Sequence, residues 1–185
     1  MKEAYHCSWY SLALHGTVVG RFTSQMAAVL LNLQVGETEL YWQSGMYHDI
    51  GKILVPSSIR LHTGEYSETE RTVMETHARL GAQILRGYNL HPMIVQAAEY
   101  HHCRFAGGGY PEPDLKGNGI PLIARMVAVA DFFAAWTERR PNRNQISPQK
   151  VWEEITKRSG THFDPQMVEV FEQTLLFREY LAQCA

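Results

Sequence analysis

Apolar residues recur along most of the chain at steps of three and four, the spacing that aligns side chains on one face of an α-helix. The clearest run predicts a long first helix, whose buried stripe contains His15, Val19, Phe22, Met26, Val29 and Leu33. Gly36 is expected to end this helix, and Thr38 is expected to cap a second helix that reaches His48. Almost no segment shows the alternation of polar and apolar residues that is typical of strands.

Further helix boundaries are marked by capping residues and prolines. Ser67-Glu68-Thr69-Glu70 has the form of a capping box and predicts a third helix that ends near Gly87. Pro92 suits the first position of a fourth helix, because its missing N–H would have no partner there. The stretch Ile53 to Tyr66, which contains a proline and a glycine, is expected to be a loop.

The second half of the chain follows the same rules. Residues 103–119 are rich in glycine and proline and predict an irregular loop, after which a fifth helix is expected. Ser147-Pro148 and Asp164-Pro165 each combine a capping residue with a proline and predict two more helix starts. Together these patterns predict an all-α single domain of about seven helices.

Composition and charge exclude several classes of protein. The chain has 17 Lys and Arg against 19 Asp and Glu, so no general basic field is available for nucleic-acid binding. The longest near-apolar stretch, Ile120 to Trp136, contains two charged residues and falls short of the ~20 apolar residues of a membrane span. The first fifteen residues make a poor signal peptide. The three cysteines form no CxxC motif and are odd in number, which does not indicate a disulfide scaffold, so a cytoplasmic location is expected.

Polar residues occupy several positions where a helix would present an aliphatic side chain to the core. One histidine of this kind is usually a core residue with a hydrogen-bond partner, and that interpretation stays open for each taken alone. Seven such residues on five helices favour a shared metal site, because imidazole and carboxylate are ligands of first-row metals. They are His15, His48, Asp49, His77, His101, His102 and Asp131. Seven candidate ligands are more than one tetrahedral zinc ion can bind. Two ions that share a carboxylate are therefore expected, with iron or manganese favoured.

Several motifs match a known family. His48-Asp49-Ile50-Gly51-Lys52 resembles the HDxGK signature of the HD phosphohydrolase superfamily. His101-His102 followed by Gly107-x-Gly109-Tyr110-Pro111 resembles the HHExxDGxGYP signature of its HD-GYP branch, the bacterial cyclic di-GMP phosphodiesterases. Three further stretches fit the same branch: Val129-Ala130-Asp131, Arg140-Pro141-x-Arg143, and Gly160-Thr161-His162-Phe163-Asp164-Pro165. The resemblance predicts a domain over residues 12–175, an N-terminal helical extension over 1–11, and the end of a C-terminal helix over 176–185.

The resemblance assigns a role to each matching residue. It implies one ion held by His15, His48, Asp49 and Asp131, and a second held by Asp49, His77, His101 and His102, with Asp49 bridging. Asp49 and Lys52 would carry the catalysis. The substrate would be contacted by Lys52, Arg140, Arg143 and Tyr110.

The expected activity is hydrolysis of cyclic di-GMP to pGpG, with GMP as a second candidate product. A hydroxide bridging the two ions would attack the phosphodiester, and the ions with Lys52 would neutralise the developing charge. The loop Gly109-Tyr110-Pro111 is associated in this branch with docking of GGDEF-type cyclase domains, so such a protein is an expected partner.

The chain departs from the branch at four positions. Ser11 stands where members with a third metal carry Glu, so two ions are expected. Cys103, Ala106 and Ala134 replace acidic residues that would orient ligands. These losses favour one alternative, a regulatory module that binds metal and docks a GGDEF-type partner. Two others stay open: a generic HD nucleotide phosphohydrolase, and an HD-type di-iron oxygenase, against which the Gly109-Tyr110-Pro111 loop, Arg140 and Arg143 count.

Overall fold

The computed structural model describes residues 9–34, 36–62, 64–138 and 146–182. These residues form no strand beyond an isolated bridge between Ser159 and Phe163, which confirms the all-α prediction. The helices are α1 (Trp9–Leu31), α2 (Glu39–Tyr47), α3 (Ser57–Arg60), α4 (Glu68–Glu75), α5 (His77–Gly87), α6 (Pro92–Tyr100), α7 (Leu122–Thr137), α8 (Pro148–Lys157), α9 (Pro165–Glu172) and α10 (Leu175–Ala182). Two 3₁₀ turns, η1 (Ile50–Leu54) and η2 (Gly117–Gly119), complete them.

The described residues hold more helices than the seven expected, for local reasons. The helix predicted from Ser67 to Gly87 is divided at Thr76, which ends α4 and precedes α5. The short α3 lies inside the segment expected to be a loop, and α10 follows α9 after a turn at Gln173. Neither α3 nor α4 contributes a buried residue, so these two helices lie outside the core.

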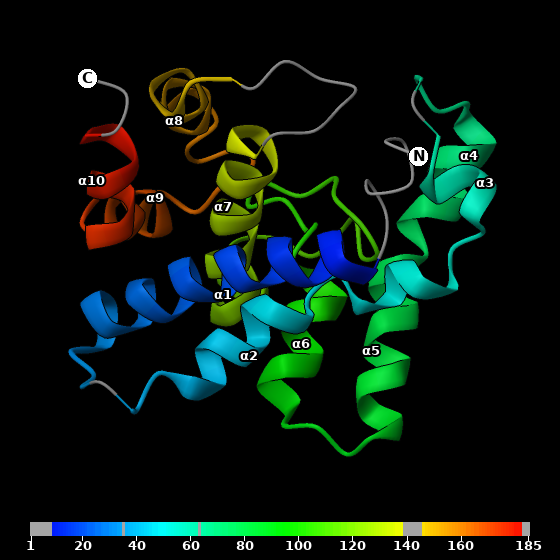
Figure 1. Cartoon of the computed structure of the whole chain (residues 1–185), viewed down its shortest axis with the longest axis horizontal. Coiled ribbons are helices and arrows are strands. Elements are labelled where there is room, and N and C mark those ends of the chain that lie inside the picture. Colours follow the sequence, from blue (N-terminus) through cyan, green and yellow to red (C-terminus); the bar gives the residue numbers. More distant parts are fainter. Residues whose placement is uncertain (1–8, 35, 63, 139–145, 183–185) are drawn as a thin grey trace.

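The long α1 organises the molecule. It runs across the centre with α2 packed along it and α7 crossing behind (Figure 1). Helices α8, α9 and α10 gather at one end of α1, while α5 and α6 lie at the other end, where α3 and α4 project (Figure 1). In the described ranges no helix has both the length and the apolar character needed to cross a membrane.

An aromatic core joins α1 to the C-terminal helices. Phe22 of α1 stacks on Phe171 of α9 at 4.8 Å between ring centroids and meets Phe133 of α7 edge-on at 5.4 Å. Phe177 of α10 lies 5.5 Å from Phe133. All four rings are almost completely buried. Such edge-to-face and offset contacts stabilise the fold beyond the area that they bury.

The end of the first helix differs from the prediction. The helix stops at Leu31, because Asn32 adopts a left-handed conformation (φ 52°) well before Gly36. Val29 is 39% exposed, since the buried stripe continues from Met26 by four residues to Leu30 and leaves Val29 on the flank. Thr38 precedes α2 as predicted, but its hydroxyl makes no capping hydrogen bond.

The other predicted helix starts are confirmed by their hydrogen bonds. The Ser67 hydroxyl accepts from the backbone of Glu70, whose carboxylate accepts in return from the Ser67 backbone. Ser147 and Asp164 accept from the first turns of α8 and α9, each followed by proline. Because capping satisfies the otherwise unpaired N–H groups, these residue types define a helix start even without tertiary information.

Candidate metal centre

All seven sequence-predicted ligand residues meet at one point of the fold. They are His15 in α1, His48 and Asp49 directly after α2, His77 at the start of α5, His101 and His102 directly after α6, and Asp131 in α7. Five of the seven are buried and at most 6% exposed: His15, His48, Asp49, His77 and His101. Helix ends place the paired residues, so that neighbours in sequence can face different parts of the cluster.

A glycine makes this convergence possible. A Cβ atom on Gly51 would lie 2.0 Å from the carbonyl oxygen of His77 and 2.4 Å from the backbone nitrogen of Gly81. Any larger residue would therefore push η1 away from α5. The close approach brings Asp49 Oδ1 to 3.3 Å from His77 Nε2, which gives a physical reason for the glycine in the His-Asp-x-Gly-Lys motif.

The candidate ligand atoms form two groups. The side chains of Asp49, His77, His101 and His102 place one donor atom each within 4.8 Å of one another, and those of His15, His48 and Asp131 do the same. Asp49 lies between the groups, because Oδ1 faces His77 while Oδ2 is 3.3 Å from His48 Nε2. The two oxygens of one carboxylate thus face two groups of donors, as a bridging ligand requires.

Three of the histidines are each oriented by the helix that precedes them in the sequence. The Nδ1–H groups of His48, His77 and His101 donate to backbone carbonyls of Gly45 (2.6 Å), Met74 (2.7 Å) and Ala98 (3.0 Å). A carbonyl can only accept, so each ring carries a proton on Nδ1, and in its neutral form the ring directs the lone pair of Nε2 into the cluster. Neutral imidazole with a free Nε2 is the form that binds a metal ion.

Four atoms at the centre of the cluster have no hydrogen-bond partner among the described residues. They are Asp49 Oδ1 and the Nε2 atoms of His48, His77 and His101. A buried polar atom left unpaired costs about 1–3 kcal/mol, so four in one place need a common compensation. Nitrogen and oxygen donors of this kind fit divalent first-row metal ions, which would satisfy all four together.

The histidines of the cluster differ in the direction in which their pKa values are shifted. Burial opposes a charge on His48, but Asp49 and Asp131 outweigh this effect and raise the pKa of His48 to about 10. Burial lowers the pKa of His77 to about 4 and that of His101 to about 3. Burial would raise the pKa of Asp49, but Lys52 and His48 hold it well below its usual value. Without metal, the proton on His48 and the ammonium of Lys52 therefore neutralise the carboxylates.

The loop after His102 closes one side of the cluster. The Tyr110 ring stacks on the His102 ring at 4.5 Å between centroids, and the Cys103 thiol donates to the Tyr110 carbonyl oxygen (3.4 Å). Arg79 of α5 donates to the Pro111 carbonyl oxygen (3.2 Å) and pairs with Glu112. Cys103 thus holds the loop and is not among the candidate ligand groups of the described residues.

The predicted substrate contacts are only partly described. Lys52 lies at the cluster, paired with the Asp49 carboxylate, and its side chain is 29% exposed. Tyr110 is next to His102, as above. Arg140 and Arg143 lie outside the described residues.

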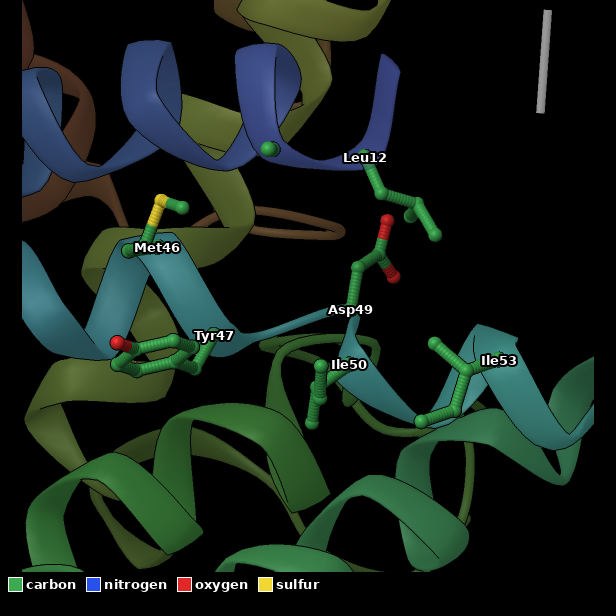
Figure 2. A pocket seen from close by; sticks show the side chains of 7 residues that line it. Leu12, Met46, Tyr47, Asp49, Ile50 and Ile53 are labelled. Atoms are coloured by element: carbon green, nitrogen blue, oxygen red, sulfur yellow. The ribbon is translucent and has the colours of Figure 1, made fainter. Parts of the chain in front are cut away.

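An apolar cavity of about 120 Å³ borders Asp49 (Figure 2). Its walls come from the first turn of α1, the end of α2, and η1, and its lining residues are Leu12, Ala13, Met46, Tyr47, Asp49, Ile50 and Ile53. Figure 2 shows the Asp49 carboxylate pointing toward the side chain of Leu12. The cluster is therefore flanked by apolar side chains on this side.

One residue of the cluster was not predicted. Glu138 follows α7, and its two carboxylate oxygens lie 3.0 and 3.1 Å from His15 Nδ1. It comes seven residues after Asp131, two helical turns on the same face, and that spacing is the only sequence signal that could have indicated it.

The comparison with known families agrees with this geometry. The HD domain family matches residues 17–167. The chain belongs to the HD domain family. The matched range covers most of the chain and contains all the candidate ligand residues except His15.

Relatives of this HD domain confirm the HD-GYP resemblance. A cyclic di-GMP phosphodiesterase of Vibrio cholerae serotype O1 is 37% identical over 140 residues, which are 72% of this chain and 28% of that protein. The cyclic di-GMP phosphodiesterase response regulator RpfG of Xanthomonas campestris pv. campestris is 36% identical over 146 residues, 78% and 38% of the two chains. The 3′3′-cGAMP-specific phosphodiesterase 2 of V. cholerae is 32% identical over 145 residues, 77% and 28%. This HD domain thus spans between 28% and 38% of the length of these relatives.

Solved structures show the same fold. A cyclic GMP-AMP specific phosphodiesterase of V. cholerae superposes with a TM-score of 0.65 at 22% identity, over 91% of this chain and 45% of that one. The HD domain of the phosphodiesterase PgpH of L. monocytogenes gives a TM-score of 0.64 at 17% identity, over 94% and 93%. At these identities the likeness concerns the architecture alone, and it confirms the HD-type helical fold.

Proposed function

We propose that this HD domain is a metal-dependent phosphodiesterase that hydrolyses cyclic dinucleotides, with cyclic di-GMP as the first candidate substrate. The observation that carries the proposal is a cluster of four buried donor atoms, Asp49 Oδ1 and three histidine Nε2 atoms, that lie within the two candidate ligand groups and have no hydrogen-bond partner among the described residues. Relatives at 32–37% identity that are named cyclic di-GMP and 3′3′-cGAMP phosphodiesterases support the substrate class. The domain limits of 12–175 and a cytoplasmic location remain predictions.

Two divalent ions, iron or manganese, would be held by the two donor groups, with Asp49 between them. When bound, such ions lower the pKa of water and neutralise charge on a phosphodiester. The protein itself holds the ligand side chains in the orientation and protonation state that metal binding requires. The backbone carbonyls of α2, α4 and α6 fix the ring orientations of His48, His77 and His101, and burial keeps the last two neutral.

Among the described residues, Lys52 is the cation beside the cluster that a phosphodiester could contact. Its ammonium pairs with Asp49 at the edge of the cluster and is partly exposed, so a phosphate oxygen can reach it from solvent. A cation beside the reacting phosphate stabilises the charge that develops as the bond breaks, so its main effect is expected on kcat. Arg140 and Arg143 remain candidates for binding the substrate's second phosphate, where losses would appear in KM.

The loop keeps its contacts with the cluster despite the departures from the HD-GYP motif, and this favours a working site over a purely regulatory one. Cys103, which replaces an acid, still holds the Tyr110 carbonyl, and Tyr110 still stacks on His102. The loop therefore keeps contact with the cluster without the expected carboxylate. A GGDEF-type partner at Gly109-Tyr110-Pro111 has no support in the comparisons and stays a prediction, as do pGpG and GMP as products.

The proposal is tested by hydrolysis assays on protein purified without oxygen and loaded with Mn²⁺ or Fe²⁺. Cyclic di-GMP, 3′3′-cGAMP, cyclic di-AMP and a linear phosphodiester are supplied separately, and products are identified by chromatography. We expect cleavage of a cyclic dinucleotide that EDTA stops and that Lys52→Ala slows through kcat. The exposed, remote Lys150→Ala serves as control.

Each outcome bears on a different part of the proposal. Cleavage of only the linear diester would replace it with a generic nucleotide phosphohydrolase. A metal-loaded protein that binds but cleaves none of the four would instead support the regulatory alternative. Activity that persists after complete metal removal would overturn metal dependence.

A further inference from the structure

His15 is held differently from the other histidines of the centre. The Nδ1–H groups of His48, His77 and His101 all donate to neutral backbone carbonyls near their own position in sequence. His15 Nδ1 instead donates to a carboxylate, at 3.0 and 3.1 Å from the two oxygens of Glu138, which is 123 residues away in sequence. A long-range charged partner at one histidine and local neutral partners at three others make the two halves of the centre unequal.

The position of Glu138 follows from the end of α7. Its backbone N–H donates to the Ala134 carbonyl oxygen (2.9 Å), and its ψ of 141° is extended, so the chain leaves the helix at this residue. Asp131, two turns earlier on α7, lies 2.9 Å from His15 Nε2. Helix α7 therefore contacts both ring nitrogens of one imidazole, Nε2 through Asp131 and Nδ1 through Glu138.

A carboxylate acceptor does more to a histidine ligand than a carbonyl does. It fixes the proton on Nδ1, and its negative charge also makes Nε2 a stronger donor to a cation. The donor group of His15, His48 and Asp131 would thus have a carboxylate ligand of its own and a second carboxylate behind it. The other group contains Asp49 as its only acidic member among the described residues.

We propose that Glu138 is a positioning residue that orients the His15 ring and makes its Nε2 a stronger donor. The ion on the His15 side of the centre would therefore bind more tightly than the other ion, and first. The proposal rests on the metal centre of the proposed function, but not on the substrate or on turnover. It also accounts for a departure seen in the sequence. Ala134 lacks the expected acidic side chain, and Glu138, one turn later, supplies a carboxylate to the site.

A purely structural role for Glu138 predicts something different. The carboxylate is 26% exposed, and an ion pair or hydrogen bond that only joins α1 to the end of α7 would affect folding without affecting metal affinity. The test must therefore measure metal binding directly. It must also include a variant that keeps the charge.

The experiment is a Mn²⁺ titration of metal-free protein, in which free Mn²⁺ is counted by electron paramagnetic resonance. For the unchanged chain we expect two Mn²⁺ per molecule with unequal affinities. Glu138→Gln is expected to weaken the tighter site about 10–100-fold and to leave the weaker one nearly unchanged. Glu138→Asp should restore much of the affinity. Glu154→Gln, which removes a carboxylate of α8 that pairs with Arg158, should bind Mn²⁺ as the unchanged chain does.

Circular dichroism on each variant reports folding separately. Equal Mn²⁺ affinities for the unchanged chain and Glu138→Gln, or an equal loss at both sites, would overturn the inference and leave the proposed function standing. A selective loss in Glu138→Gln, combined with no hydrolysis of any cyclic dinucleotide by the unchanged chain, would support the inference and contradict the function. A loss of helix in Glu138→Gln that Glu138→Asp does not repair would assign Glu138 to folding alone.

Discussion

The aromatic core and the candidate metal centre are both buried, and both are built on α1 and α7. Phe22 and Phe133 face the core from these helices, while His15 and Asp131 face the metal centre from the same two. The core rings pack against one another at 4.8–5.5 Å. The centre instead contains four buried polar atoms that find no hydrogen-bond partner in the described part of the chain. The core therefore contributes stability, and the centre costs stability until a ligand satisfies it.

The largest effect on stability is expected from Phe22→Ala. The ring is fully buried and contacts Phe133 and Phe171, so its loss should lower the free energy of unfolding by about 3–5 kcal/mol, measured by urea denaturation. If the alanine variant does not fold, the same measurement is made on Phe22→Leu, which removes less of the side chain. The remaining folded molecules should bind Mn²⁺ normally, and a lost metal site in well-folded Phe22→Leu would show that core and centre are not separable. Tyr88→Ala, at a 78% exposed ring, is the control.

Asp49→Asn is expected to have the opposite effect to Phe22→Ala: it should lower activity while the fold is kept. A neutral amide cannot balance two cations, so turnover should fall by at least roughly 10²–10³-fold, the loss typical when one preorganised electrostatic group is removed. Helix content should be retained, because Asn keeps the shape of Asp. Steady-state kinetics beside Asp114→Asn, at an exposed loop position, measure the effect. Near-normal turnover would mean that Asp49 does not bridge the donor groups.

The metal-free protein is expected to be most stable near pH 6.5. An unfolded histidine titrates near 6.5, whereas burial lowers the folded pKa of His77 to about 4 and that of His101 to about 3. As pH falls below 6.5 the unfolded chain takes up these protons first, so stability decreases toward pH 4. His48 has the opposite sign: Asp49 and Asp131 outweigh burial and raise its pKa to about 10, so its contribution is lost as pH rises from 6.5 to 10.

Urea unfolding between pH 4 and pH 10, with and without Mn²⁺, measures this profile. Added Mn²⁺ should remove the decrease on the alkaline side, because the ion replaces the proton of His48 between the carboxylates. A stability of the metal-free protein that rises steadily from pH 6.5 to pH 9 would contradict a charged His48.

The smallest effect is expected for Cys103→Ala. The thiol has only long contacts to the carbonyl oxygens of Tyr110 (3.4 Å) and Glu112 (4.0 Å), so the free energy of unfolding should change by about 0.5–1.5 kcal/mol. The number of Mn²⁺ ions bound should not change, as counted by elemental analysis. A variant that loses one ion would make Cys103 a ligand and would place part of the loop inside the centre.

The sequence predicted the centre better than it predicted the ends of the helices. Histidines at helical spacing among apolar residues have few ways to be buried, so His15, His77 and His101 indicated a common site without any tertiary information. Helix ends depend on local competition instead. Nothing in the spacing of residues 67–87 indicated that Thr76 would divide the segment into α4 and α5.

Glu138 was missed for a different reason. Its partner His15 is 123 residues away, and an acidic residue after a helix is ordinarily solvated. Only the packing of α1 against α7 makes it part of the centre. Long-range partners of ligands thus require the fold, whereas ligands on apolar stripes can be found in the sequence.

The most direct test of the account is a crystal structure of the metal-loaded protein, with the ions located by anomalous scattering. We expect two ions about 3.5–4 Å apart, the separation typical of two-metal hydrolytic sites. Asp49 should bind both, with His15, His48 and Asp131 on one ion and His77, His101 and His102 on the other. A single ion in fully loaded protein, or a second ion with His15 or Asp131 turned away from it, would contradict the dinuclear centre.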